Sequence, residues 1–234
     1  MTRQLAADFV ALAFDLDGTL VDSRRDLAAA INVVRAARGL APHALPAVEG
    51  MVGDGVVMLV RRAFPELDDA ALPAAIAEFL TAYERGCLDT TRPYPGIEAL
   101  LAAAARRWPL AVLTNKPERL AIRVLAGLGL AGRFQVVVGG DSLPVRKPDP
   151  ATLLLVAGRL RVPAARLPLI GDSRVDLATA RGAGAPAIAV AWGYGRLTAE
   201  DLAGANGVAR SVPALAALLG LPASPGGSRA TPGC

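Results

Sequence analysis

The sequence predicts an α/β fold in which a parallel sheet is covered by helices and a small all-helical segment follows the first strand. Short apolar runs alternate with helical patterns from residue 97 onward, which is typical of parallel strands joined by helices. Residues 23–90 show helical patterns and no strand pattern. Polar residues follow the apolar runs directly, and ligands bind at the carboxyl ends of the strands in such sheets.

The first strand is expected over residues 9–14, where an apolar run leads into Asp15 and Asp17. Side chains alternate along a strand, so the two carboxylates start on the same side of its end. Such a pair repels and needs a cation, a shared proton or a substrate charge beside it. The alternative is a pair of turn-forming aspartates, which strand ends often carry.

The segment 23–90 is expected to be helical throughout. Its first helix begins at Ser23 and presents Leu27, Ile31 and Val34 on one face. The expected elements are a helix over 23–39, a loop at 41–46, a loop leading into a helix within 48–64, and a helix over 67–88. The breaker cluster at residues 93–96 then returns the chain to the sheet.

From residue 97 the chain is expected to alternate between helices and strands. The predicted helices cover residues 97–107, 118–127, 149–160, 176–183 and 212–219. The predicted strands cover residues 110–113, 134–138, 167–170, 187–191 and 208–209. The sequence therefore predicts a core formed by residues 1–22 and 91–221, with residues 23–90 inserted in it. Residues 222–234 are rich in Pro, Gly and Ser and are expected to form a disordered tail.

The composition argues against several classes of protein. Hydrophobic residues make up 53% of the 234 residues, yet no apolar run approaches the ~20 residues of a membrane span. The first residues show no secretory signal, so we expect a cytoplasmic protein without a membrane partner. Cys87 and Cys234 do not make a disulfide framework or a metal site. The single histidine, His43, lies in a predicted loop, which disfavours catalysis based on histidine.

The net charge of +4 comes mainly from arginine, because Lys116 and Lys147 are the only lysines. A basic surface can bind nucleic acid. Here the arginines are scattered among acidic residues, and the chain has few aromatic residues, so we expect no nucleic-acid partner. The scarcity of lysine makes the positions of these two informative.

Polar residues at the other predicted strand ends favour phosphate chemistry. Asp172 joins the two carboxylates described above, and a set of oxygen ligands without His or Cys suits Mg²⁺. Lys147 offers a compact positive charge, and Thr114 and Asn115 can bind a phosphoryl oxygen. Each of these also has a simpler interpretation, as a turn, an exposed loop lysine or a helix cap.

Four motifs in this order resemble the signature of the haloacid dehalogenase superfamily. They are DxDGT at 15–19, Thr-Asn at 114–115, Lys-Pro at 147–148 and GDxxxD at 171–176. Longer stretches such as FDLDGTLVDS and LTNKP are similar to bacterial phosphoglycolate phosphatases, and the resemblance spans about residues 8–221. It implies a Rossmann-like parallel-sheet core with a helical cap, and a hydrolase that acts on phosphoric monoesters.

The resemblance also implies a role for each motif residue. Asp15 would be the nucleophile that forms an aspartyl-phosphate, and Asp17 the acid for the leaving alcohol and then the base for water. Mg²⁺ would be held by the Asp15 side chain, the Asp17 backbone carbonyl and Asp172, with Asp176 behind them. Thr114 and Lys147 would bind the phosphoryl group. The helical segment would be a mobile cap that closes over the site.

The expected reaction is hydrolysis of 2-phosphoglycolate to glycolate and phosphate. A substrate carboxylate requires a cation or a backbone nest in the cap, which Gly53 and Gly55 together with Arg62 or Arg24 can offer. The simpler interpretation is a helix-entry loop and a surface arginine. Alternative substrates are pyrophosphate, a nucleotide or a sugar phosphate, and a catalytically idle basic binding module is the non-enzyme alternative. We expect a small phosphate ester as the partner, and a monomer or homodimer.

Overall fold

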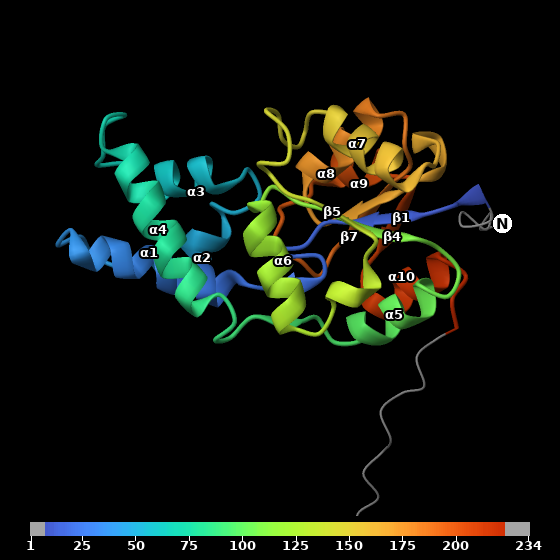
Figure 1. Ribbon diagram of the computed structural model, residues 1–234, viewed down its shortest axis with the longest axis horizontal. Coiled ribbons are helices and arrows are strands. Elements are labelled where there is room, and N and C mark those ends of the chain that lie inside the picture. Colours follow the sequence, from blue (N-terminus) through green and yellow to red (C-terminus); the bar gives the residue numbers. More distant parts are fainter. Residues whose placement is uncertain (1–7, 223–234) are drawn as a thin grey trace, which may run out of the picture.

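The computed structural model describes residues 8–222, and a six-stranded parallel sheet forms its centre (Figure 1). The strands lie in the order β5-β4-β1-β6-β7-β8, and all neighbouring pairs are parallel. Their bounds are β1 Leu12–Phe14, β4 Leu110–Leu113, β5 Val136–Val138, β6 Leu169–Gly171, β7 Ala187–Val190 and β8 Gly207–Ala209. The predicted α/β fold with a parallel sheet is confirmed.

Strand β1 lies in the middle of the sheet because the chain builds the sheet first on one side of it and then on the other. After β1 come β4 and β5 on one side, followed by β6, β7 and β8 on the other. Ligands in open α/β sheets bind where the strand order reverses in this way. The carboxyl end of β1, which leads into Asp15, is therefore the place where a site is expected.

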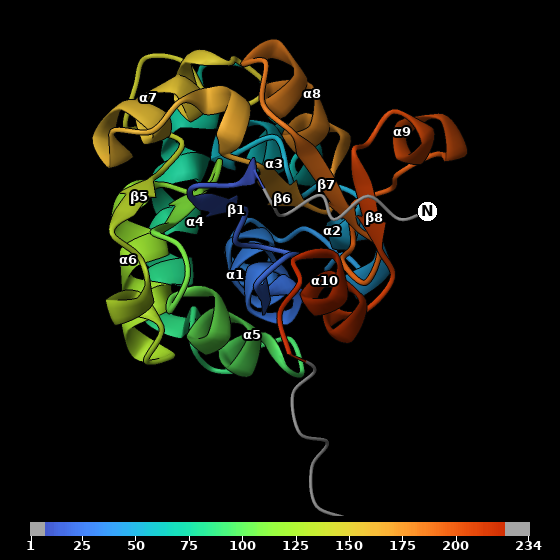
Figure 2. The same ribbon diagram turned by 90° about the vertical axis from the view of Figure 1, so that its right-hand side faces the viewer.

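Helices cover both faces of this sheet (Figure 2). Helices α7 and α8 pack against small strand residues such as Ala13 and Ala189, while α5, α6 and α10 pack against larger ones such as Leu12 and Phe14. Successive β1 side chains thus enter opposite cores, as strand alternation requires. The helices and 3₁₀ helices are α5 Ile97–Ala104, α6 Glu118–Gly127, η2 Ala131–Arg133, α7 Ala151–Leu160, η3 Ala164–Arg166, α8 Arg174–Gly182, α9 Ala199–Ala203 and α10 Val212–Leu218.

Four further helices form a small helical cap at one end of the sheet (Figure 1). We use the term cap for residues 23–90, which contain α1 Arg24–Ala37, α2 Leu45–Glu49, α3 Val56–Ala63 and α4 Leu72–Gly86. The buried faces of α1 and α4 pack together through residues such as Ile31 and Phe79. None of the helices in residues 8–222 is long and apolar enough to cross a membrane.

The structure differs from the sequence-based expectation in some of its short elements, which include α2, α9 and the strands β2 (Val21–Asp22) and β3 (Arg92–Pro93). The short helix α2 begins within the expected loop 41–46, with Pro46 in its first turn, and a loop with Gly53 and Gly55 at positive φ separates it from α3, the helix expected within 48–64. Helix α9 was not expected, although Thr198 and Asp201 form the capping box that marks its start. The predicted tail at 222–234 lies outside the described residues except for its first residue.

Two neighbouring chain crossings join the cap to the sheet. Strands β2 (Val21–Asp22) and β3 (Arg92–Pro93) pair antiparallel, so the chain enters and leaves the cap side by side. The buried Asp26 carboxylate strengthens this junction, because it accepts hydrogen bonds from the backbone N–H and hydroxyl groups of both Thr90 and Thr91. The start of α1 is therefore tied to the returning chain.

Candidate active site

The loop after β1 brings Asp15 close to Asp172, which follows β6. Strands β1 and β6 are neighbours, and the Asp15 N–H donates to the carbonyl of Ile170 at 2.9 Å. The chain turns at Gly18, where φ is 91°, and a Cβ there would lie 2.3 Å from Asp172 Oδ2. Only glycine permits this approach. Thr19 then donates its hydroxyl to Asp172 Oδ1 at 3.0 Å.

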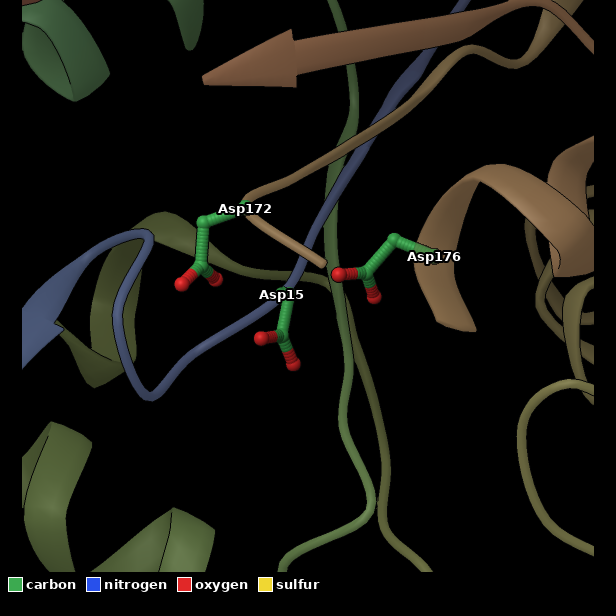
Figure 3. Close-up of side chains that lie close together, drawn as sticks. All are labelled: Asp15, Asp172 and Asp176. Carbon is green, nitrogen blue, oxygen red and sulfur yellow. The ribbon is translucent and has the colours of Figure 1, made fainter. Parts of the chain in front are cut away.

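Three buried carboxylates converge beyond the strand ends (Figure 3). One oxygen from each of Asp15, Asp172 and Asp176 lies within 4.8 Å of the other two. Asp176 comes from the first turn of α8, where it forms a capping box with Ser173. A Cβ at residue 171 would lie 2.3 Å from Asp176 Cγ, so Gly171 is needed at this point of the turn.

Lys147 lies behind Asp15 and is almost fully buried. Its Nζ donates to Asp15 Oδ1 at 2.8 Å, to Asp176 Oδ1 at 2.6 Å and to the carbonyl of Leu113 at 2.9 Å. These bonds use all three ammonium protons. Burial lowers the pKa of Lys147, but the Asp15 and Asp176 charges outweigh it and raise the pKa. In this arrangement Lys147 orients Asp15 and has no proton left for a phosphoryl oxygen.

One lysine does not neutralise three carboxylates. Burial, with Asp176 and Asp172 nearby, raises the pKa of Asp15 to about 7 even though Lys147 lowers it. Burial and the Asp176 charge raise the pKa of Asp172 to about 6. This uncompensated negative charge and the oxygen-only donor set fit a hard divalent cation such as Mg²⁺. Lys147 is paired with Asp15 and Asp176, whereas Asp172 accepts only from the neutral donors Thr19 and Gly195 N–H among the described residues, so Asp172 is the carboxylate that most needs a cation.

The Asp17 side chain points to a different set of partners. Lys116 Nζ lies 2.8 Å from each of its carboxylate oxygens, and the Ser23 hydroxyl donates to Oδ1 at 2.5 Å. The Ser23 hydroxyl in turn lies 3.1 Å from the hydroxyl of Tyr194. Asp15 and Asp17 are thus held by separate lysines. Lys116 has no predicted role in the site, although its being one of only two lysines made its position informative.

A small cavity of about 60 Å³ lies between this loop and the cap. The predicted site residues Asp15, Asp17, Thr114, Gly53 and Gly55 are part of its wall. The remaining lining residues are Leu27, Val52, Val56, Leu59, Phe79, Leu80, Tyr83, Asn115, Lys116, Pro117 and Leu120. The cavity therefore has reactive carboxylates on the sheet side and a mostly apolar surface on the cap side.

Two predicted phosphoryl-binding residues follow β4. The Thr114 hydroxyl accepts from the Lys116 N–H at 3.2 Å and keeps its own proton to donate. The Asn115 amide donates to the carbonyls of Gly53 and Lys147, both at 3.0 Å, and so connects the cap loop to the core.

The predicted cap cations lie elsewhere. Arg62 pairs with Asp54 and donates to the carbonyl of Met51, and it is not among the described residues that line the cavity. Arg24 pairs with Asp22 and Glu49. The structure therefore brings neither arginine to the cavity wall in residues 8–222.

Comparison with known proteins places this site in a wider context. A family model described as haloacid dehalogenase-like hydrolase matches residues 12–190. A phosphoglycolate phosphatase of Rhodospirillum rubrum is 45% identical over 233 residues, covering 95% of this chain and 96% of that protein. One from Xylella fastidiosa is 42% identical over 184 residues, covering 77% of this chain and 80% of that protein.

Solved structures show the same fold. The crystal structure of a predicted phosphoglycolate phosphatase from Haemophilus somnus has a TM-score of 0.82 and 28% identity, covering 88% of this chain and 96% of that one. That of a predicted phosphatase from Clostridium acetobutylicum has a TM-score of 0.78 and 25% identity, covering 88% and 96%.

Proposed function

The chain belongs to the haloacid dehalogenase-like hydrolase family and is a phosphoric monoester hydrolase, and we propose that it hydrolyses 2-phosphoglycolate to glycolate and phosphate. The observation that carries the choice of substrate is the cavity of about 60 Å³ beside Asp15 and Asp17. A water molecule needs roughly 10–15 Å³ on this measure, so the cavity is small and favours a compact ester. A nucleotide or a sugar phosphate is much larger. The name of the 45% identical relative supports the same substrate.

Asp15 is the proposed nucleophile. Lys147 holds its Oδ1, which leaves Oδ2 to attack the phosphorus in line with the leaving oxygen. The new bond joins Asp15 and phosphorus, the ester P–O bond breaks, and the electron pair stays on the glycolate oxygen. The product of this step is an aspartyl-phosphate on Asp15. Thr114 lines the cavity, and its hydroxyl is the proposed donor to a phosphoryl oxygen.

Asp17 is the proposed proton-transfer group. It lines the cavity beside Asp15, and Ser23 and Lys116 fix its carboxylate. In its protonated form Asp17 gives a proton to the departing glycolate, and the resulting carboxylate takes one from the water that attacks the aspartyl-phosphate, which releases phosphate and restores the acid. Mg²⁺ held by Asp15, Asp172 and the Asp17 backbone carbonyl would neutralise negative charge on the phosphoryl group. The cap would exclude bulk water during the first step.

The test is turnover of a panel of phosphate esters with Mg²⁺ and with a chelator. We expect the highest kcat/KM for 2-phosphoglycolate, and loss of activity in the chelator. The panel includes pyrophosphate, a nucleoside monophosphate and a hexose phosphate, and a higher kcat/KM for one of these contradicts the proposed substrate. Acid quenching during turnover followed by peptide mass spectrometry should find a phosphoryl group on Asp15.

A further inference from the structure

A buried tyrosine hydroxyl in the cap lacks a hydrogen-bond partner. Tyr83, on α4, is 1% exposed and lines the cavity. Among residues 8–222 its hydroxyl has no partner, although a buried polar group normally has one. Its ring is stacked on Phe79 at 5.8 Å between centroids, which fixes the position of the hydroxyl. A substrate atom in the cavity is the natural acceptor for this proton.

Lys116 lies next to this hydroxyl on the core side of the cavity. Its Nζ is 4.6 Å from the centroid of the Tyr83 ring, and of the described residues that line the cavity it alone is cationic. An ammonium has three N–H bonds, and the two Asp17 oxygens account for two of them. Ser23 also donates to Asp17, so Asp17 does not depend on Lys116 alone. The third N–H of Lys116 faces the Tyr83 side chain, so an acceptor placed between the two groups can bond both.

The surroundings strengthen any bond formed there. The cap side of the cavity is lined by apolar residues, among them Leu59, Phe79 and Leu80. Hydrogen bonds between charged groups are strong when water is excluded in this way. An ammonium and a hydroxyl together match a carboxylate, which has two oxygens and only accepts hydrogen bonds.

We propose that Lys116 Nζ and the Tyr83 hydroxyl form a carboxylate subsite that binds the acidic group on the alcohol part of the substrate. The subsite selects phosphate esters of small hydroxy acids over esters of neutral alcohols, and so it rests on the proposed function. Lys116 comes from the core and Tyr83 from the cap. The subsite is complete only when the two lie together, so a carboxylate bound there favours that arrangement.

The test is binding of two phosphonates that cannot be hydrolysed, measured by calorimetry on the full chain with Mg²⁺. The probes are 3-phosphonopropionate, which carries a carboxylate, and propylphosphonate, which does not. We expect the full chain to bind the carboxylate probe about ten- to hundredfold more tightly. Tyr83→Phe, which removes only the hydroxyl, should reduce this ratio about tenfold. Lys116→Met should abolish it.

Arg62→Met is the matched control, because it removes a cap cation outside the cavity wall and should leave the ratio unchanged. Equal affinity of the wild-type chain for the two probes overturns the subsite, as does loss of the ratio in Arg62→Met alone. An equal loss for both probes in Lys116→Met and no change in Tyr83→Phe also overturns it. If Lys116→Met fails to fold, Tyr83→Phe carries the test.

Turnover of phosphate esters separates this inference from the proposed function. Hydrolysis of 2-phosphoglycolate without a binding preference for 3-phosphonopropionate removes the subsite and leaves the proposed function intact. A binding preference without hydrolysis of any ester supports the subsite and contradicts the proposed function.

Discussion

The two walls of the cavity differ in how far their polar groups are already satisfied. Behind the sheet wall, Lys147 is joined to Asp15 and Asp176 by hydrogen bonds of 2.6–2.8 Å, and of the wall's buried polar side-chain atoms only Asn115 Oδ1 has no partner among the described residues. On the cap side the wall is mostly apolar, and the Tyr83 hydroxyl is unpaired among the described residues. A group whose hydrogen bonds are already made can hold a reacting atom in position. An unpaired donor can instead form a hydrogen bond with a bound ligand. The sheet wall thus carries the reaction, whereas the choice of substrate depends on the cap wall together with Lys116.

The local backbone explains the difference. On the sheet side, close turns at Gly18, Gly171 and Gly193 let the carboxylates approach neighbouring chain segments, because a Cβ at any of the three would lie 2.3 Å from an atom of Asp172 or Asp176. On the cap side, the lining residues come largely from helix faces, where side chains can change without disturbing such turns. The sheet wall therefore tolerates little variation, and the cap wall tolerates more.

The largest expected effect is that of Asp15→Asn on the sheet wall. An amide is not a nucleophile, so kcat should fall by about 10⁴-fold or more while the fold is retained. Steady-state turnover and a circular-dichroism melt measure the two properties. Asp69→Asn, which changes an exposed aspartate, should leave both unchanged. Retained activity in Asp15→Asn refutes the nucleophile assignment.

The next effect concerns Mg²⁺ binding at Asp172. Near-saturating Mg²⁺ should stabilise the chain against unfolding by about 2–3 kcal/mol, seen as a rise in Tm of several degrees. Asp172→Asn should lose most of this gain. Asp26→Asn also alters a buried carboxylate, but one bonded to Thr90 and Thr91. It should lower Tm and keep the Mg²⁺ response, and loss of the response in both variants contradicts a site at Asp172.

The stabilisation of the folded chain by Mg²⁺ should depend on pH. Without a cation, burial and the neighbouring carboxylates raise the pKa of Asp15 to about 7 and that of Asp172 to about 6, above the ordinary value of 3.8. The folded chain then holds more protons than the unfolded one between these values, so the stability from these groups is lost as pH rises through about 6–7. Mg²⁺ competes with those protons. Its stabilising effect should be larger at about pH 8 than at about pH 5.5, and equal effects exclude binding at these carboxylates.

The smallest expected effect is that of Arg62→Met on the cap. Arg62 is paired with Asp54 outside the cavity wall, and exposed ion pairs contribute little. The KM for 2-phosphoglycolate should change less than about twofold, whereas Tyr83→Phe should raise it. A large increase in the KM of Arg62→Met would contradict the assignment of substrate recognition to Tyr83.

Much of the sheet wall follows from the sequence. Parallel strands end at one edge, so apolar runs ending in Asp15, Thr114 and Asp172 predict that these residues lie near one another, and the structure places them there. The order of the motifs predicts Lys147 in the same region, and its Nζ contacts Asp15.

The cap wall and the partners of Asp17 do not follow from the sequence in the same way. Tyr83 belongs to an ordinary apolar helix face, and only its position against the core reveals the unpaired hydroxyl. The Lys116–Asp17 pair joins residues 99 positions apart and depends on the direction of a turn. The sequence suggested Arg62 as a cation for the substrate carboxylate because it follows a glycine loop. In the structure its side chain pairs with Asp54 instead.

The paired strands β2 and β3 also bear on how such an enzyme can change. Val21 lies opposite Pro93 and Asp22 opposite Arg92, so the cap starts and ends at adjacent points. An inserted unit whose ends are adjacent can be exchanged for another without stretching the host. A gene that acquires a different insert at this ribbon would keep Asp15, Lys147 and Asp172 in place and replace the surface that faces them. The β2–β3 pair is thus a point at which a different cap can be inserted, which changes the substrate specificity without altering the reaction centre.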